Sequence, residues 1–177
     1  MEQKYPILTH AMTYGLYAGI GMVAIGLLSY FTGSFLVSRF QLLYYFNTAF
    51  FTYTSISRYR DTMTNGNINY GRSLGIGTYT IFWSSMIYAF FIFVLYTYID
   101  PSLKEQFINI IEKALQANNY PEDQIVALVQ LYKMVLTPFA IAFFELMGKT
   151  LMGFFFALLL AFFTRRNTIV YDNNEQQ

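Results

Sequence analysis

Glu145 and Lys149 are the two residues of this chain best placed to do chemistry. They lie four residues apart in a long apolar segment, so a helix puts them on one face, with the acid in the favourable N-terminal position. A charged side chain in a bilayer costs on the order of 3 kcal/mol by insertion scales, and it is tolerated when paired and turned inward. Two interpretations stay open. The pair is either a functional site for a proton, an ion, a headgroup or a partner helix, or a structural ion pair that fixes helix rotation.

Neutral polar residues are expected at the depth of this pair. Counting about 1.5 Å per helical residue places Asn47 level with Glu145. The same count places Ser84, Ser85 and Tyr88 near Lys149. We therefore predict an intramembrane polar site that contains Glu145, Lys149, Asn47, Ser84 and Ser85.

Catalytic signatures are missing from the sequence. It contains no Gly-rich phosphate loop, no H-E-x-x-H and no G-x-S-x-G motif. Zero cysteines and a single histidine, His10, exclude thiolate nucleophiles and Cys- or His-rich metal centres. Asp61 and Asp100 are expected on opposite sides of the membrane, too far apart to act as an acid/base pair. We predict no enzyme activity, no catalytic residue, no bound metal and no cofactor.

Four apolar segments must position these residues. Hydrophobic residues make up 55% of the chain and charged residues 12%, a balance typical of integral membrane proteins. A spanning helix needs about 20 mostly apolar residues, and the segments 12–31, 35–57, 74–99 and 139–164 reach that length. The sequence thus predicts one all-α domain over residues 1–177, a four-helix transmembrane bundle. The first segment is too long for a signal peptide and lacks a cleavage site, so we expect it to be retained.

Basic residues near the span ends predict the orientation. If the four spans alternate, one side carries Lys4, Arg58, Arg60, Arg72, Arg165 and Arg166. The other side carries Arg39, Lys104, Lys113 and Lys133, three of them among acidic residues. We therefore expect both termini in the cytoplasm. Arg58, Arg60 and Arg72 either enforce this topology, the favoured interpretation, or contact lipid headgroups or a partner.

Small residues line one face of the first span. Gly15, Gly19, Met22 and Gly26 follow one another at steps of four, three and four residues. This spacing lets another helix backbone approach closely. Packing against a neighbouring helix of the same chain is the favoured interpretation, and homodimerisation is the alternative.

A long segment separates the third and fourth spans. Residues 102–137 alternate apolar and charged positions at helical spacing on both sides of a break at 118–121. They predict an extracytoplasmic amphipathic helical hairpin. Its apolar stripe must be covered by the outer end of the bundle, which we favour, by the membrane surface or by a partner protein. The tail 167–177 is polar and expected to be loose.

Three stretches carry a resemblance to a known family. They are Ser57-Arg58-Tyr59-Arg60-Asp61 with Ile68-Asn69-Tyr70-Gly71-Arg72, the acidic helical segment 103–133, and Phe143-Phe144-Glu145-Leu146 running on to Arg165-Arg166. From Tyr14 to Arg166 the chain resembles the domain of unknown function 4199 family of small bacterial membrane proteins. That family has no established activity, so the resemblance supplies no catalytic residue. It implies a location in a bacterial inner membrane and the role of an accessory subunit in envelope lipid-linked glycan work, beside a polyprenyl-phosphate glycosyltransferase.

The sequence therefore favours a non-catalytic accessory or scaffold subunit of an envelope-biogenesis complex. It would contact membrane lipids and a membrane enzyme through the glycine face, the hairpin and the cytoplasmic arginines. The alternative is a small oligomeric transporter or channel built around Glu145 and Lys149. A net charge of +1 gives no indication of a nucleic-acid partner.

Overall fold

The computed structural model describes residues 6–36 and 40–165, and these residues are largely helical. The expected all-α class is confirmed for this part of the chain. The long helices are α1 (Pro6–Phe31), α2 (Gln41–Met63), α3 (Tyr70–Val94) and α6 (Pro138–Thr164). A π-helical segment, η2 (Leu95–Ile99), extends α3, and the shorter helices α4 (Ser102–Ala117) and α5 (Glu122–Val135) precede α6. Lys4, Arg39, Arg166 and the tail 167–177, used above for orientation, resemblance and domain limits, lie outside the described residues.

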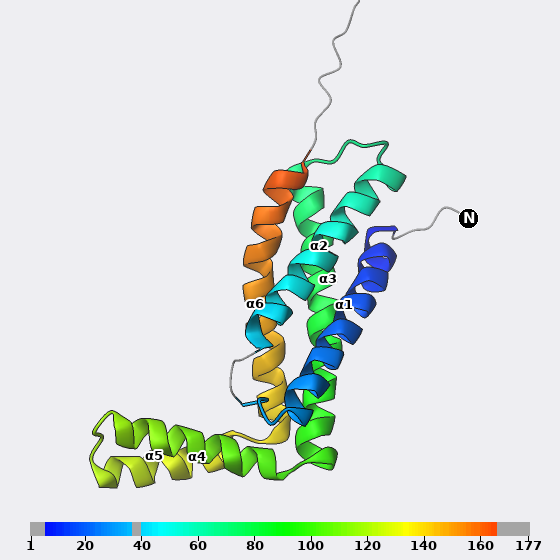
Figure 1. The fold of residues 1–177 in the computed structure, drawn as a ribbon. Coiled ribbons are helices and arrows are strands. Elements are labelled where there is room, and N and C mark those ends of the chain that lie inside the picture. Colours follow the sequence, from blue (N-terminus) through cyan, green and yellow to red (C-terminus); the bar gives the residue numbers. More distant parts are fainter. Residues whose placement is uncertain (1–5, 37–39, 166–177) are drawn as a thin grey trace, which may run out of the picture.

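Helix α3 is the centre of the bundle. It packs along both α1 and α6, and α2 lies against α1, α3 and α6 (Figure 1). The chain direction alternates, so α1 and α3 both begin at the upper end of Figure 1, where α6 ends. Helix α2 returns the chain between them, and it starts partway along the bundle rather than at its lower end.

Three of these helices are long and apolar enough to cross a membrane. They cover Ile7–Phe31, Tyr70–Ile99 and Pro138–Thr164. Helix α2 does not reach the same hydropathy, because hydroxyls, Asn47 and two arginines interrupt its apolar residues. It also begins at Gln41 and ends at Met63, later at both ends than the expected span 35–57.

Local capping sets the other boundaries. The side chain of Asn69 accepts a hydrogen bond from the backbone N–H of Arg72 at 2.9 Å, so α3 starts at Tyr70, before the expected residue 74. Thr137 caps α6 in the same way through Ala140 N–H at 3.2 Å, with Pro138 in the first turn, close to the expected start at 139. Helix α1 begins at Pro6, ahead of the expected residue 12.

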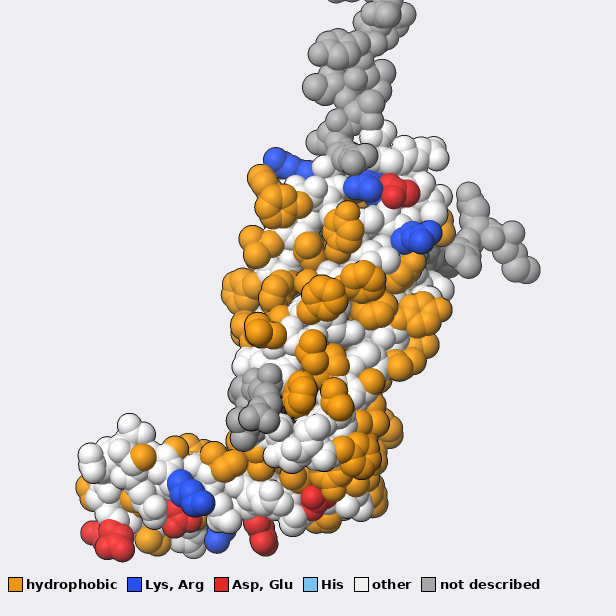
Figure 2. Space-filling view, in the orientation of Figure 1, with side chains coloured by type: hydrophobic (Ala, Val, Ile, Leu, Met, Phe, Trp, Pro, Cys, Tyr) orange, Lys and Arg blue, Asp and Glu red, His pale blue; other side chains and the backbone are white. Residues whose placement is uncertain are grey.

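The bundle exposes a broad band of large apolar side chains. Figure 2 shows it along the length of the long helices, with basic side chains at the end where α6 finishes and both basic and acidic side chains on the arm. On α6 the exposed residues include Phe139, Phe143, Met147, Leu151, Phe155 and Leu159. A continuous apolar surface of this size in water promotes aggregation, whereas in hydrocarbon it is the normal outer surface. The three apolar helices and this band indicate a membrane protein.

Glycines allow α1 and α3 to approach closely. A Cβ added at Gly15 would lie 2.6 Å from the Cβ of Trp83, and one at Gly19 would lie 2.8 Å from Ile87. Gly26 faces Phe91 and Tyr88 in the same way, and Met22 is only 2% exposed. The predicted glycine face is therefore covered by α3 of the same chain. It is not open to a partner helix, so this part of the expected partner surface is corrected.

Helices α4 and α5 form a unit that we call the arm, residues 102–135. The two helices pack side by side, and Lys104 Nζ, near the start of α4, donates a hydrogen bond to the carbonyl of Lys133, near the end of α5, at 3.1 Å. They are therefore antiparallel. Figure 1 shows the arm reaching sideways from the end of the bundle where α3 finishes and α6 starts. Leu103 and Ile108 of α4 belong to the buried cluster that contains Leu136 and Ile141, and partly buried arm residues pack against this cluster, namely Phe107, Ile111, Val129 and Tyr132. The core cluster, which reaches the bundle end that we favoured as the cover, thus covers part of the apolar stripe, whereas Ile110, Leu131 and Val135 stay exposed.

Candidate functional site

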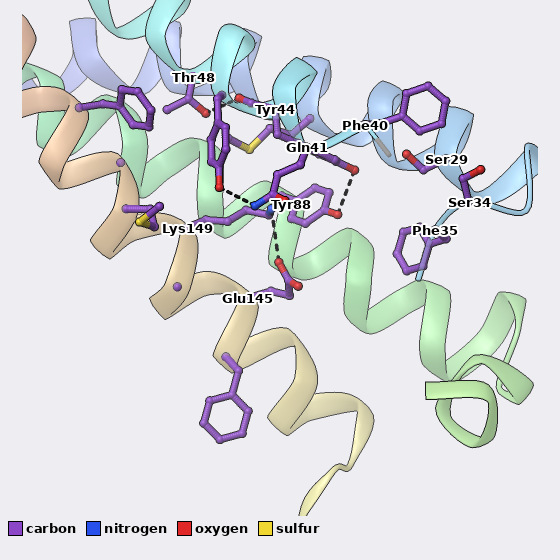
Figure 3. A pocket seen from close by; sticks show the side chains of 17 residues that line it. Ser29, Ser34, Phe35, Phe40, Gln41, Tyr44, Thr48, Tyr88, Glu145 and Lys149 are labelled. Atoms are coloured by element: carbon purple, nitrogen blue, oxygen red, sulfur yellow. Dashed lines mark hydrogen bonds and ion pairs between the residues drawn. The ribbon is translucent and has the colours of Figure 1, made fainter. Parts of the chain in front are cut away.

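A groove between α2 and α6 surrounds the charged pair. Its cavity has a volume of about 460 Å³, and Figure 3 shows Tyr44 of α2, Tyr88 of α3 and the pair on α6 pointing toward one another. Gln41 in the first turn of α2 and Ser29 near the end of α1 also line it. Phenylalanine and methionine side chains supply most of the remaining wall. The groove is thus a small polar centre inside an apolar surface.

Glu145 and Lys149 form the expected ion pair. Lys149 Nζ lies 3.4 Å from Glu145 Oε2. The Lys149 side chain is 24% exposed and that of Glu145 is 41% exposed, so the carboxylate is the more open member of the pair. The i, i+4 spacing on α6 brings the two groups together without help from another helix.

Two tyrosines hold the ammonium group of Lys149. Its Nζ lies 4.5 Å from the ring centroid of Tyr44 and 4.5 Å from that of Tyr88. Each ring face attracts a cation by about 0.5–2 kcal/mol, with the larger values where water is excluded. The two hydroxyl oxygens are 3.1 Å apart and share a hydrogen bond, which fixes the rings relative to each other. Residues from three helices, α2, α3 and α6, therefore position Lys149. The ion-pair partner of Glu145, in contrast, lies on the same helix as Glu145 itself.

The neutral residues predicted for this site lie elsewhere. Asn47 Nδ2 donates to the carbonyl of Ala18 on α1 at 2.9 Å, so its side chain is turned away from the groove. Ser84 Oγ donates to the Ile81 carbonyl of its own helix at 2.8 Å, and Ser85 is fully buried. None of the three lines the cavity. The predicted polar site is corrected: Tyr44 and Tyr88 take the places assigned to Asn47, Ser84 and Ser85.

Sequence reasoning noted the depth of Tyr88 and missed Tyr44. The chain has 16 tyrosines, so a tyrosine in a span carries little signal by itself. The signal that would find Tyr44 is rotation: it precedes the buried Thr48 by four residues and therefore shares its inward face of α2.

Arg58, Arg60 and Arg72 lie at the opposite end of the bundle from the arm. Arg60 Nε donates to Asp61 Oδ1 at 2.8 Å, and Arg60 Nη1 donates to the Thr164 carbonyl at 3.4 Å. The Asp61 hydrogen bond raises the pKa of Arg60 above its ordinary value. Arg60 thus ties the end of α2 to the end of α6. Arg58 and Arg72 are exposed and open to contact with a headgroup or a partner.

The groove contains one acidic and one basic side chain among its lining residues. Among its lining residues in the described part of the chain, Glu145 is the only carboxylate and it is paired with a base. No group of three or more His, Cys, Asp or Glu residues within 6–36 and 40–165 is arranged to hold a metal ion. What the groove offers is one ammonium group, one carboxylate and hydroxyls beside apolar walls.

Comparison with family models found one match, described as "Protein of unknown function (DUF4199)", over residues 13–166. The match begins in α1 and ends just after α6, so it includes the bundle, the groove and the arm. Comparison with curated proteins gave no match, and comparison with solved structures gave none.

Proposed function

This chain belongs to the DUF4199 family, as the resemblance indicated, and we propose that it is a non-catalytic multi-pass membrane protein that binds a phospholipid headgroup in the groove between α2 and α6. It serves there as an accessory or scaffold subunit of an envelope-biogenesis complex. The observation that carries the proposal is the arrangement of Lys149 between two tyrosine rings beside a half-exposed Glu145, in a groove on a lipid-facing bundle.

Four helices cross the membrane in this proposal, with α2 as the least apolar span. Helices α1 and α3 start at the same end of the bundle, so the chain between them must return across the bilayer, and α2 is the segment that does so. Its 23 residues extend about 34 Å, enough for the hydrocarbon core. The large exposed side chains Leu42, Phe46, Phe50 and Tyr53 give α2 an apolar outer surface.

Charge distribution supports a cytoplasmic location for both termini of the chain. Among the described residues, the end where α6 finishes carries four arginines, Arg58, Arg60, Arg72 and Arg165, with one aspartate. The arm end carries five acidic residues, Asp100, Glu105, Glu112, Glu122 and Asp123, with three lysines. Basic residues near span ends are retained on the cytoplasmic side. The arm is therefore extracytoplasmic, in a bacterial inner membrane.

Cysteine labelling tests this topology, since the chain has no native cysteine. Gln116→Cys on the arm should react with a membrane-impermeant maleimide in intact spheroplasts. Met63→Cys at the opposite end should react only after the cells are lysed. Labelling of both positions in intact spheroplasts, or of Met63→Cys alone, would contradict the proposed orientation.

A zwitterionic headgroup matches the charges of the groove. The phosphate of phosphatidylethanolamine can accept hydrogen bonds from Lys149, beside the first turn of α2, where a helix carries partial positive charge. Its ammonium group can donate to Glu145, whose carboxylate is 41% exposed. An anionic lipid such as phosphatidylglycerol, or a polyprenyl phosphate, would pair with Lys149. It has no ammonium group for Glu145, and its negative charge would repel the Glu145 carboxylate.

Native mass spectrometry of the full chain tests the proposed ligand. With equal amounts of the three lipids added to protein in detergent, we expect phosphatidylethanolamine adducts to exceed phosphatidylglycerol adducts about tenfold, the effect of roughly 1.4 kcal/mol for one additional ion-pair contact. Glu145→Gln should remove this preference, and Lys133→Met, a lysine of the arm, should leave it unchanged. Equal retention of the three lipids by the unmodified chain would contradict the headgroup proposal. Preferential retention of polyprenyl phosphate would instead assign the groove to a lipid carrier.

The proposed accessory role has its own measurement. Affinity purification from native membranes, followed by mass spectrometry, should recover a multi-pass envelope enzyme, for which a polyprenyl-phosphate glycosyltransferase is the partner that the family resemblance implies. The Arg58→Ala/Arg72→Ala variant should reduce its recovery, because these exposed arginines are candidate contacts. Proton or ion flux in liposomes that disappears with Glu145→Gln would instead favour the transporter alternative.

A further inference from the structure

The apolar face of α4 turns toward the bundle at its base and continues beyond it. Leu103, Ile110 and Ala114 follow at steps of seven and four residues, so they share one face of the helix. Leu103 is 4% exposed because it packs in the core cluster with Leu136 and Ile141. About two turns further along the same face, Ile110 is 42% exposed. At Ile110 the arm extends beyond the bundle, and its apolar face still points in the same direction.

Helix α5 contributes to the same side of the arm. Leu131 and Val135, four residues apart, are 51% and 49% exposed. They lie roughly a quarter to a third of a turn from Ile125, the buried residue of α5. Because the two helices are antiparallel and packed together, this rotation places Leu131 and Val135 on the side that carries Ile110.

Charged residues occupy the opposite side. Glu105 on α4 lies about 140° from Ile110 around the helix, and Glu122 on α5 lies about 180° from Leu131. Figure 2 shows hydrophobic side chains along the edge of the arm nearest the bundle and acidic side chains along the far edge. The arm is thus a two-helix layer with one apolar and one charged side.

The apolar side of the arm faces the level at which the lipid bilayer ends. Figure 1 shows the arm running across the direction of the long helices, at the end where α6 begins. The first turns of α6 expose Phe139 (71%), Phe143 (48%) and Phe144 (57%), which indicates that hydrocarbon reaches up to this level. A sideways extension at that level faces the bilayer surface.

We propose that the arm is an interfacial membrane anchor that lies flat on the bilayer, with Ile110, Leu131 and Val135 inserted at the boundary of headgroups and acyl chains. Amphipathic helices of this kind bury their apolar side about 5–10 Å into that region. The acidic side then faces water and is held away from the lipid phosphates. The anchor fixes how far the bundle sits in the membrane and prevents it from tilting, and this proposal depends only on the apolar helices crossing the bilayer.

Site-directed spin labelling of the full chain in phosphatidylethanolamine/phosphatidylglycerol liposomes tests the anchor. Nitroxides placed through Leu131→Cys and Val135→Cys should be accessible to dissolved oxygen and shielded from a water-soluble nickel complex. Val126→Cys is the matched control, because Val126 is also apolar and exposed, at 63%, but shares the helix face of Glu122. Its label should be accessible to nickel.

Two results would overturn the proposal. Nickel accessibility at both Leu131→Cys and Val126→Cys would place the arm in water. Shielding of the Leu131→Cys label from oxygen and nickel together would show that protein, such as a second copy, covers the apolar side.

A second variant tests the anchor without a label on α5. Leu131→Glu with Val135→Glu should move a label at Ile110→Cys from an oxygen-accessible to a nickel-accessible environment, whereas Val126→Glu should not. Size-exclusion chromatography in detergent checks that both variants remain folded. An unchanged Ile110→Cys label in the double variant would contradict insertion of this side.

Discussion

Replacement of Lys149 by methionine should destabilise the bundle more than replacement of Glu145 by glutamine. Lys149→Met leaves the Glu145 carboxylate without the ammonium group that lies 3.4 Å from it. Glu145→Gln leaves Lys149 over the rings of Tyr44 and Tyr88, which still stabilise its charge. An uncompensated buried charge costs about 3–5 kcal/mol. Since Glu145 is 41% exposed, we expect a smaller loss, about 2–3 kcal/mol for Lys149→Met and about 1 kcal/mol for Glu145→Gln.

The free energy of unfolding in mixed micelles with increasing dodecyl sulfate measures these losses. The double variant should be more stable than Lys149→Met, because no charge then remains in the groove. Lys133→Met, on the arm, is a control that should change the free energy little. A double variant less stable than either single variant would show that the pair is not the stabilising unit we describe. Equal losses for the two single variants would show that the tyrosine rings do not hold the ammonium group.

The pairing of Glu145 with Lys149 could be predicted because it depends on one helix. The i, i+4 spacing sets the distance whatever the rest of the chain does. The surroundings of the pair could not be predicted in the same way. Counting residues gives the depth of a side chain along a helix, but not the direction in which the helix is rotated. Asn47 has the expected depth and is turned toward Ala18.

Capping residues made the start of α6 predictable but not that of α3, which the Asn69 cap places at Tyr70, four residues before the expected 74. Thr137-Pro138 begins α6 close to the expected residue, whereas α2 starts six residues later than the expected 35. Aromatic residues around position 35 are apolar enough to extend a span in a hydropathy count, and nothing local shows that the helix has not yet started. That delay is what leaves room for the groove beside Gln41 and Tyr44.

The arm shows a different limit of prediction from sequence. The spacing of apolar residues predicted two amphipathic helices near 102–137, and α4 and α5 lie there. The same pattern fits any apolar surface, so it could not decide what covers the stripe. The direction of the arm leaves Ile110, Leu131 and Val135 exposed beyond the bundle end, and that direction depends on how η2 leads into α4.

A substitution in the glycine face should also destabilise the bundle strongly, because these glycines bring the backbones of α1 and α3 close together. A Cβ at Gly15 would lie 2.6 Å from Trp83 Cβ and 2.9 Å from the Thr80 carbonyl oxygen. Both atoms belong to the rigid part of α3, so a side-chain rotation cannot relieve the clash, and α1 must move away from α3. Overpacking of this kind costs about 1–3 kcal/mol.

Gly15→Ala should therefore lower the free energy of unfolding by about 2 kcal/mol even though alanine favours a helix. Gly75→Ala in α3 is the matched control, because no atom lies within 4 Å of the added Cβ. That variant should be neutral or more stable by up to about 1 kcal/mol, since alanine loses less backbone entropy than glycine. Both variants are compared in the same mixed micelles. Equal stability of the two would contradict the contact between α1 and α3. Loss of an oligomer by Gly15→Ala, without loss of monomer stability, would instead place the glycine face between two copies of the chain.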